Sequence, residues 1–517
     1  MKIKSVFSRS LFILALSNLA SPQFAQTSAP NYPVKRTESA ETWLRGGRAA
    51  IERAKNLKPI KKRAKNVILF VGDGMGVTTL TAARILEGQI RGESGEENRL
   101  SFENFPYSAL SKTYSVNQQT SDSAPTMSAI ITGVKTDEGI LSVNQRVVRG
   151  DYRTVKGNET KTFLEMAEEA GKSTGIVSTA RLTHATPAAC YAHSPDRDWE
   201  SDKDIFDRSK DAAEGKFPDI ARQLIEFNYG DGLEVALGGG RSKFLPKQTQ
   251  DPEYADRTGE RLDTRNLPNE WTTKYKDSAF VWNKAQFDAI DAKKTKHLLG
   301  LFERSHMQYE HDRSKDKGGE PSLSEMTTKA IDVLSNNKKG FFLMVEAGRI
   351  DHSHHDGNAY RALTDSIELS NAVRAALSKV NLEETLIIVT ADHSHTFTMA
   401  GYPARGNNIM GLVREVDDKG LAEEKPKGDK NSLPYTTLGY ANGLGARNKP
   451  REVLTQEEVL NPNYLQEATV PLTNETHGGE DVAIFADGAG AYLVRGSMEQ
   501  NWIFHIMLEA SRLKIKN

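Results

Sequence analysis

The sequence has little cysteine, little net charge and no long hydrophobic run after its N-terminus. Cys190 is the only cysteine among 517 residues, so no disulfide can form within the chain, and this residue is most simply a small buried side chain. With 68 basic and 69 acidic residues, the formal net charge of -1 provides no overall field to attract nucleic acid or an anionic membrane. A membrane-spanning helix needs about 18 consecutive apolar residues, and no later segment offers them. We therefore expect no nucleic-acid-specific binding and no transmembrane anchor.

The N-terminus is typical of an exported protein. A basic segment, MKIKSVFSRS, precedes the short apolar run LFILALSNLA, and the small residues Ala20, Ala25 and Ala29 could mark cleavage. We assign residues 1–25 to a signal peptide cleaved between 20 and 29, which predicts a periplasmic or secreted protein. The C-terminal ASRLKIKN lacks the apolar tail of a GPI signal.

Buried strands alternate with helical patterns along most of the chain. Five apolar runs end in polar residues: KNVILFVGDGMG, STGIVSTARLTHAT, GFFLMVEAGRIDH, TLIIVTADHSH and EDVAIFADG. Their alternation with helices predicts an α/β fold, doubly wound, with a mostly parallel central sheet and helices on both faces. We expect one catalytic domain over 65–515, an amphipathic helix at 39–57 outside it, and a crown-like surface subdomain inserted at 400–475, where the alternation stops.

Histidines and carboxylates follow several of these strands. The stretch EAGRIDHSHHDGN at 346–358 holds three of the chain's 12 histidines, and VGDGMG, TADHSH and ETHGGED add further Asp and His residues. Mixed Asp and His ligands suit zinc, whereas an all-oxygen set suits magnesium. Asp351 and His355, four residues apart, share one face of a helical turn. Such a cluster alone is often metal-free, but four strand-end clusters on one sheet predict a metal centre.

Two further side chains are candidates for catalysis. Ser123, in SDSAPTMSAIITG, lies at the start of a helical pattern, where backbone N–H groups and the helix dipole favour an anion. The simpler interpretation is that Ser123 is only an N-cap. Arg197, in AHSPDRDW, is either a surface arginine or a bidentate clamp on phosphate oxygens.

These motifs, taken in order, resemble those of the alkaline phosphatase family. The similar stretches are VGDGMGVTTLTAARIL, DSAPTMSA, HATPAACYAH, EAGRIDHSHHDGNAYRALT, VTADHSHTF and ETHGGEDVAIF, and the resemblance extends from about residue 40 to 512. The chain is closer to the animal enzymes than to the enteric bacterial type, because His184 and His352 stand where the enteric type has Asp and Lys.

The resemblance implies a role for each matching residue. Ser123 would be the nucleophile, and Arg197 would bind the substrate phosphate. Three ions would share the remaining ligands: a first zinc on Asp351, His355 and His477, a second zinc on Asp73, Asp392 and His393, and a magnesium on Asp73, Thr186 and Glu346. His184, His352 and His395 would act just outside the ligands, whereas His354 and Asp356 are expected to be solvated loop residues. A peripheral calcium ion would be held by Glu214, the Phe302 carbonyl, Glu303 and Glu320.

The resemblance predicts a phosphoric monoester hydrolase, an alkaline phosphatase that works through a phosphoserine with two zinc ions and one magnesium per chain. It also implies a homodimer in which the helix at 39–57 reaches the partner through Trp43, Leu44 and Ile51. Two alternatives stay open. One is a phosphodiesterase or sulfatase on the same metal scaffold. The other is a non-catalytic exported zinc-binding protein, which would leave Ser123 and Arg197 without a role.

Overall fold

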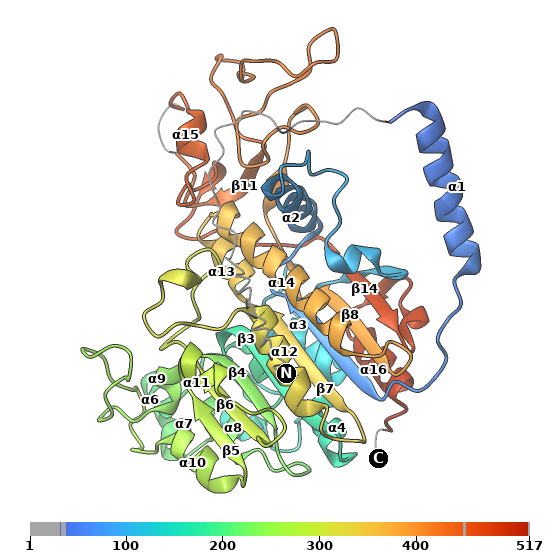
Figure 1. Cartoon of the computed structure of the whole chain (residues 1–517). Coiled ribbons are helices and arrows are strands. Elements are labelled where there is room, and N and C mark those ends of the chain that lie inside the picture. Colours follow the sequence, from blue (N-terminus) through green and yellow to red (C-terminus); the bar gives the residue numbers. More distant parts are fainter. Residues whose placement is uncertain (1–31, 33–37, 448–450, 515–517) are drawn as a thin grey trace, which may run out of the picture.

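A ten-stranded sheet forms the centre of the computed structural model, which describes residues 32, 38–447 and 451–514 (Figure 1). The strand order is β15-β2-β14-β8-β1-β7-β3-β4-β6-β5. In chain order the strands are β1 (Asn66–Gly72), β2 (Tyr107–Lys112), β3 (Ser173–Arg181), β4 (Val235–Gly239), β5 (Ser278–Val281), β6 (His297–Leu301), β7 (Phe341–Ala347), β8 (Thr385–Ala391), β14 (Val482–Gly488) and β15 (Gly496–Glu499). The signal peptide and cleavage site assigned to residues 1–29 lie outside the described residues.

The predicted mostly parallel sheet is confirmed. β1 pairs in parallel with β7 on one side and β8 on the other, whereas β14 is antiparallel to both β8 and β2. Within β1, Val67, Leu69 and Val71 enter the core on one face, and Ile68 and Phe70 enter the core on the other. Both faces are therefore covered, which explains why the strand sequence is a continuous apolar run.

Helices form a layer on each face of the sheet. One core contains side chains from α2 (Val77–Ile90), α12 (Leu323–Leu334) and α14 (Ala359–Lys379). The other contains side chains from α3 (Ser123–Thr132), α4 (Phe163–Glu169), α5 (Ala185–Ala188), α8 (Ile220–Glu226), α10 (Leu267–Lys274) and α16 (Trp502–Ser511). The shorter helices are α6 (Asp202–Arg208), α7 (Lys210–Glu214), α9 (Arg241–Phe244), α11 (Lys284–Asp288), α13 (Arg349–His355) and α15 (Gln456–Val459), with 3-10 turns at Ser101–Asn104, Tyr152–Thr154, Arg313–Lys315 and Ala491–Leu493.

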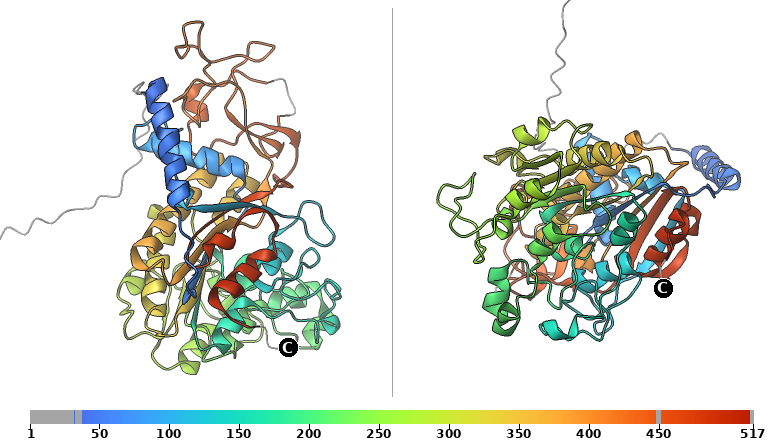
Figure 2. Two further views of the ribbon diagram at one scale, coloured as in Figure 1. Left: turned by 90° about the vertical axis from the view of Figure 1, so that its right-hand side faces the viewer. Right: turned by 90° about the horizontal axis from the view of Figure 1, so that it is seen from below.

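The described part of residues 400–475 carries loops and most of a small separate sheet at the upper end of the molecule (Figures 1 and 2). This sheet consists of β10 (Phe397–Met399), β11 (Leu438–Gly443) and β12 (Ala468–Pro471). A small apolar cluster of its own contains Leu412, Leu454, Val459 and Tyr464. Two short strands, β9 (Ser394–His395) and β13 (His477–Gly478), pair where the chain leaves the central sheet and returns to it. This pairing places His395 opposite His477.

Helix α1 (Ala40–Asn56) lies away from the rest of the chain (Figures 1 and 2). None of its residues is buried, and the side chains of Trp43, Leu44 and Ile51 are 63%, 61% and 58% exposed. Its N-terminus is closed by a capping box between Ser39 and Thr42. Among the described residues, no helix combines the length and apolar character needed to cross a membrane.

Candidate active site and metal centre

The site lies at the carboxyl ends of the three central strands. Asp73 follows β1, Glu346 is the next-to-last residue of β7, and Asp392 follows β8. Because β1 lies between β7 and β8 in parallel register, these three carboxylates are brought together, and each is 0% exposed. Ligands of doubly wound sheets gather at this edge.

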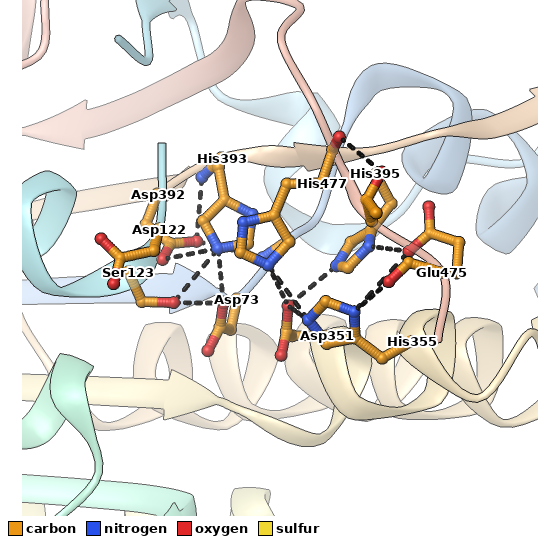
Figure 3. A network of polar contacts seen from close by, with 12 residues as sticks. Asp73, Asp122, Ser123, Asp351, His355, Asp392, His393, His395, Glu475 and His477 are labelled. Carbon is orange, nitrogen blue, oxygen red and sulfur yellow. Dashed lines mark hydrogen bonds and ion pairs between the residues drawn. The ribbon is translucent and has the colours of Figure 1, made fainter. Parts of the chain in front are cut away.

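Ser123 is the first residue of α3, and its side chain faces this carboxylate group (Figure 3). Its Oγ lies 3.1 Å from His393 Nε2 and 3.4 Å from Asp73 Oδ1. The N-cap residue of α3 is Asp122, so the interpretation of Ser123 as a plain N-cap is wrong. Asp122 does not cap the helix with its side chain; its Oδ2 instead accepts a hydrogen bond of 2.8 Å from Arg197.

Asp351, His355 and His477 converge in a way that protein groups alone leave unsatisfied. The Nδ1 atoms of His355 and His477 donate to the carbonyls of Glu475 and Ser121 at 2.7 and 2.8 Å, so in the neutral form of each ring the Nε2 carries a lone pair. These two Nε2 atoms face each other at 3.1 Å, and each lies 3.3 Å from Asp351 Oδ1 (Figure 3). Lone pairs and a carboxylate oxygen that meet without a proton between them repel, and a bound cation removes that repulsion.

His393, Asp392 and Asp73 form a second group beside Ser123. His393 Nε2 lies 3.4 Å from an oxygen of each aspartate. Asp392 Oδ1 accepts hydrogen bonds from the backbone N–H groups of Gly74 and His393, which fixes its orientation. The Oδ2 atoms of both aspartates are buried and have no hydrogen-bond partner. Burial, together with the charges of neighbouring carboxylates, raises the pKa of Asp73 well above its usual value and also raises the pKa of Asp392.

A third group contains Glu346, Asp73 and Thr186. Burial is the main cause that raises the pKa of Glu346 to about 7, and both Thr186 and Asp73 are close enough to act on this carboxyl group. One carboxylate oxygen of Glu346 accepts a hydrogen bond from Ser178, whereas its Oε1 has no partner. Asp73, Glu346 and Thr186 offer oxygens, the kind of ligand that magnesium prefers. A ring nitrogen of His184 lies within 4.8 Å of the Asp73 and Glu346 oxygens.

Arg197 connects the serine helix to a group of neutral histidines. One of its nitrogens holds Asp122, and another lies 3.1 Å from His184 Nε2. The rings of His184 and His352 are 5.3 Å apart, and His306 lies 4.0 Å from His352. Burial first, and then nearby arginines, lowers the pKa of His184 and of His352 well below the usual value, so both rings are neutral. Sequence reasoning missed Asp122 and His306.

His395 is held between two carboxylates. Its Nε2 donates to Asp351 Oδ1 at 2.9 Å and its Nδ1 to Glu475 Oε2 at 2.6 Å. Although burial lowers the pKa of His395, these hydrogen bonds raise it to about 9, so the ring carries a proton on both nitrogens. Sequence reasoning missed Glu475, although this residue stands only two positions before His477 and is 1% exposed.

The stretch at 349–355 is the helix α13, which presents Asp351 and His355 on one side. The expectation that His354 is a solvated loop residue is wrong, because His354 is 0% exposed and bonded to Thr79 and Tyr440. Asp356, at the C-cap of α13, is exposed as expected and accepts a hydrogen bond from Tyr309.

Two of the expected calcium ligands, Glu303 and Glu320, lie in a peripheral acidic group. Glu303 and Glu320, both buried, lie with Asp316 and Glu253, whose charges raise the pKa of Glu320 to about 9 after the larger effect of burial. Glu214 lies in α7, and it is not among the charges that act on Glu303 or Glu320. Glu253 thus adds a carboxylate that the sequence analysis did not name, and Glu214 stays a prediction as a calcium ligand.

The residues present fit bound metal ions. Bare imidazole nitrogens face carboxylate oxygens in the first two groups, and buried carboxylate oxygens without partners occur in the second and third. Such an arrangement belongs to a metal-dependent enzyme with a serine poised beside the metal ligands.

Comparison with known proteins agrees with this class. The sequence profile of the family "Alkaline phosphatase" matches residues 64–513. An alkaline phosphatase of Gadus morhua is 44% identical over 477 residues, covering 91% of this chain and 96% of that protein. The tissue-nonspecific isozyme of Homo sapiens is 46% identical over 456 residues, covering 87% and 84% of the two chains. The chain belongs to the alkaline phosphatase family, and its reaction is the hydrolysis of phosphate monoesters.

Solved structures share the fold. The alkaline phosphatase of Thermus thermophilus superposes with a TM-score of 0.61 at 24% identity, covering 90% of this chain and 94% of that one. The enzyme of the Antarctic bacterium TAB5 gives a TM-score of 0.58 at 22% identity, covering 88% and 100%.

Proposed function

We propose that this phosphatase transfers the phosphoryl group of its substrate to Ser123 and then to water, in a site loaded with two zinc ions and one magnesium. The observation that carries this proposal is the pair of Nε2 lone pairs, on His355 and His477, that face each other at 3.1 Å beside Asp351. The same groups fit the ligand assignment that the family resemblance implies.

Three groups of residues would hold the three ions. The first zinc would be held by Asp351, His355 and His477, the second by Asp73, Asp392 and His393, and the magnesium by Asp73, Thr186 and Glu346. When bound, they would supply Lewis-acid chemistry that lowers the pKa of the serine hydroxyl and neutralises charge on phosphate oxygens.

In the first step Ser123 Oγ would attack phosphorus in line with the leaving oxygen. The Oγ–P bond forms as the ester P–O bond breaks, and the alcohol leaves with a proton. In the second step water attacks the phosphoserine, so that phosphate leaves and Oγ regains a proton. The start of α3 favours negative charge at this position.

Arg197 would bind two oxygens of the phosphoryl group through its planar guanidinium. Asp122 holds it from one side at 2.8 Å, and His184 lies 3.1 Å away. The neutral rings of His184 and His352 neither add to nor cancel the positive charge of Arg197, which Asp122 compensates only from one side. A dianionic monoester gains most from it, which favours monoesters over diesters and sulfate esters.

We further propose export and a homodimer. The first proposal rests on the N-terminal sequence, and the second on the exposed apolar side chains of α1. A calcium ion would be held by Glu214, the Phe302 carbonyl, Glu303 and Glu320, as the family resemblance implies.

Chelation tests the metal proposal. Activity on a chromogenic monoester should fall to background after dialysis against a strong chelator, and zinc with magnesium should restore it. Elemental analysis should find about two zinc ions and one magnesium per restored chain. Active protein without zinc would contradict the assignment, and equal rates on a monoester, a diester and a sulfate ester would favour the alternative enzymes. Zinc binding without turnover would favour the non-catalytic protein.

A further inference from the structure

A second group of carboxylates lies at the other end of β3, away from the catalytic edge. Glu168 ends the buried part of α4, Glu234 stands directly before β4, and Asp231 lies in the loop between α8 and β4. One oxygen of each carboxylate lies within 4.8 Å of the others. In Figure 1, α4, α8 and α10 lie at the lower end of the molecule, and α13 lies towards the upper end. The group has no part in the mechanism above.

Two of the three carboxylates are buried without a compensating cation. Glu168 is 1% exposed and Glu234 is 6% exposed. No lysine or arginine of the described residues forms an ion pair with Glu168, Glu234 or Asp231. Burial is the main cause that raises the pKa of Glu168 to about 10 and that of Glu234 to about 7. Buried carboxylates need either a proton or a cation.

Both buried carboxylates are already oriented by the start of β3. Glu168 Oε1 accepts a hydrogen bond of 2.5 Å from the Thr174 hydroxyl, and Glu234 Oε2 accepts one of 2.6 Å from the Thr174 backbone N–H. Glu168 Oε2 is buried and has no partner. Thr174 thus orients the side chains of both Glu168 and Glu234, and the Oε2 atom of Glu168 remains without a hydrogen bond.

An unpartnered hydroxyl lies against the same loop. Tyr275, 7% exposed, packs flat on His297, and its hydroxyl is buried without a hydrogen bond. A Cβ on Gly232, which follows Asp231, would meet this hydroxyl at 2.3 Å. The charges of Glu168, Glu234 and Asp231 all act on Tyr275. The hydroxyl of Tyr275, at the end of α10, therefore lies against the backbone next to Asp231.

The loop approaches these groups closely because glycines flank Asp231. Gly230 has φ +56°, and a Cβ there would lie 2.4 Å from Glu168 Oε2. Gly232 has φ +92°. Any larger side chain at either position would fill the space between Asp231, the buried oxygen of Glu168 and the Tyr275 hydroxyl.

We propose that Glu168, Asp231 and Glu234 form a binding site for a divalent, oxygen-seeking cation, Ca²⁺ by chemical preference. Three carboxylates with no nitrogen or sulfur ligand are the set such ions take. Glu168 and Glu234 would bind from inside, Asp231 would bind from the solvent side, and the Tyr275 hydroxyl would bond to a water on the ion. The ion would tie the ends of α4, β4 and α10 together.

Equilibrium dialysis with Ca²⁺ on the zinc- and magnesium-loaded enzyme tests this site. Glu168→Gln and Glu234→Gln should each bind one Ca²⁺ fewer per chain than the wild type. Glu169→Gln is the matched control, because it removes the same charge from the next residue, which is exposed and lies outside the group. Its Ca²⁺ count should equal that of the wild type. Equal counts in all four proteins would overturn the proposal and would indicate that Glu168 and Glu234 share a proton instead.

Terbium luminescence gives a second test that does not depend on a variant. The Trp271 and Tyr275 rings lie 4.8 Å apart, so Tb³⁺ bound beside Tyr275 should emit when these rings are excited. Ca²⁺ should displace that emission in the wild type, and Glu168→Gln should lose the part that comes from Tb³⁺ beside Tyr275, but not emission from the group of Glu303 and Glu320, while keeping phosphatase activity. Absence of ring-sensitised emission in the wild type, or emission unchanged in active Glu168→Gln, would contradict the site.

Discussion

Glu475 accepts hydrogen bonds from two segments of the metal centre, one that carries His395 and one that carries His355. Its carboxylate accepts hydrogen bonds from His395 and from the Thr396 backbone, at 2.6 and 2.7 Å. Its carbonyl accepts the Nδ1–H of His355 at 2.7 Å, which turns the Nε2 of that ring towards Asp351. A residue of this kind sets the orientation of ligands without touching the ion.

Glu475→Gln should therefore weaken zinc binding by about 10- to 100-fold, the usual effect of losing such a contact. The backbone carbonyl remains, so His355 keeps its orientation and the effect stays within this range. Competition with a chromogenic chelator measures the zinc affinity. Glu480→Gln is the control, since Glu480 is exposed and its carboxylate accepts a hydrogen bond from the Ser394 hydroxyl, not from a histidine. If both variants hold zinc as tightly as the wild type, the role of Glu475 is wrong.

The sequence was sufficient to predict the side chains that converge at the strand ends. It was not sufficient to predict the residues that hold those side chains in place. Asp73, Asp392 and Glu346 were predictable because each ends a recognisable buried strand. Asp122, Glu475 and His306 were missed because their roles arise from long-range contacts, such as that between Asp122 and Arg197, 75 positions apart. His354 was misplaced because a histidine in a polar stretch looks solvated until Tyr440, from the distant β11, is seen to cover it.

At the scale of elements, a buried arginine joins α9, β6 and the loop that follows α9. Arg241, 0% exposed, binds both oxygens of Asp251 at 3.0 and 2.8 Å and the Leu301 carbonyl at 3.0 Å. Although burial raises the pKa of Asp251, its hydrogen bonds to Arg241 lower it below the usual value overall. The pair is buried on both sides, so removing one partner leaves an uncompensated charge.

Asp251→Asn should destabilise the protein by about 3 kcal/mol at pH 7, the lower end for a broken buried pair, because Glu253 still contacts Arg241. Since the folded-state pKa of Asp251 is depressed, its contribution is fully present above the ordinary aspartate pKa of about 3.9 and is lost as the pH falls through the lower folded-state value. Urea unfolding of metal-free protein at pH 7 and near pH 3 measures both effects. A difference between variant and wild type that does not shrink in acid would contradict this account.

Strands were more predictable than helices and loops. The five apolar runs correspond to β1, β3, β7, β8 and β14, because burial on both faces makes such strands continuous in sequence. The antiparallel direction of β14 was not visible, since apolarity carries no information on strand direction. The helix α13 was partly predicted through the spacing of Asp351 and His355, whereas its flanking polar residues resembled a loop.

At the scale of the whole molecule, α1 packs against no other element of the described residues 38–447 and 451–514. A 17-residue helix gains little stability alone in water, and α1 buries none of its residues. The exposed side chains of Trp43, Leu44 and Ile51 would be covered if a second copy packed against them. This geometry favours the homodimer proposed above.

Removing residues 39–57 should therefore shift the protein from dimer to monomer, or weaken the dimer strongly, in light scattering at micromolar concentration. A triple variant with Trp43, Leu44 and Ile51 changed to Ser should act in the same direction while keeping the chain length. Replacing the exposed charged residues Arg48 and Glu52 with Ser provides the control, with no change in mass expected. A wild type that is monomeric under these conditions would contradict the proposal.

The central claim is covalent catalysis by Ser123, and acid quenching during turnover tests it most directly. With a ³²P-labelled monoester, the quenched enzyme should carry label on the peptide that contains Ser123, and Tris should intercept this intermediate to give a transphosphorylated product. Ser123→Ala should lose the label and most of the rate but keep its zinc, because the ligands remain; Ser128→Ala, in the same helix, should keep the label. Label on another residue, or a near-normal rate in Ser123→Ala, would contradict the account.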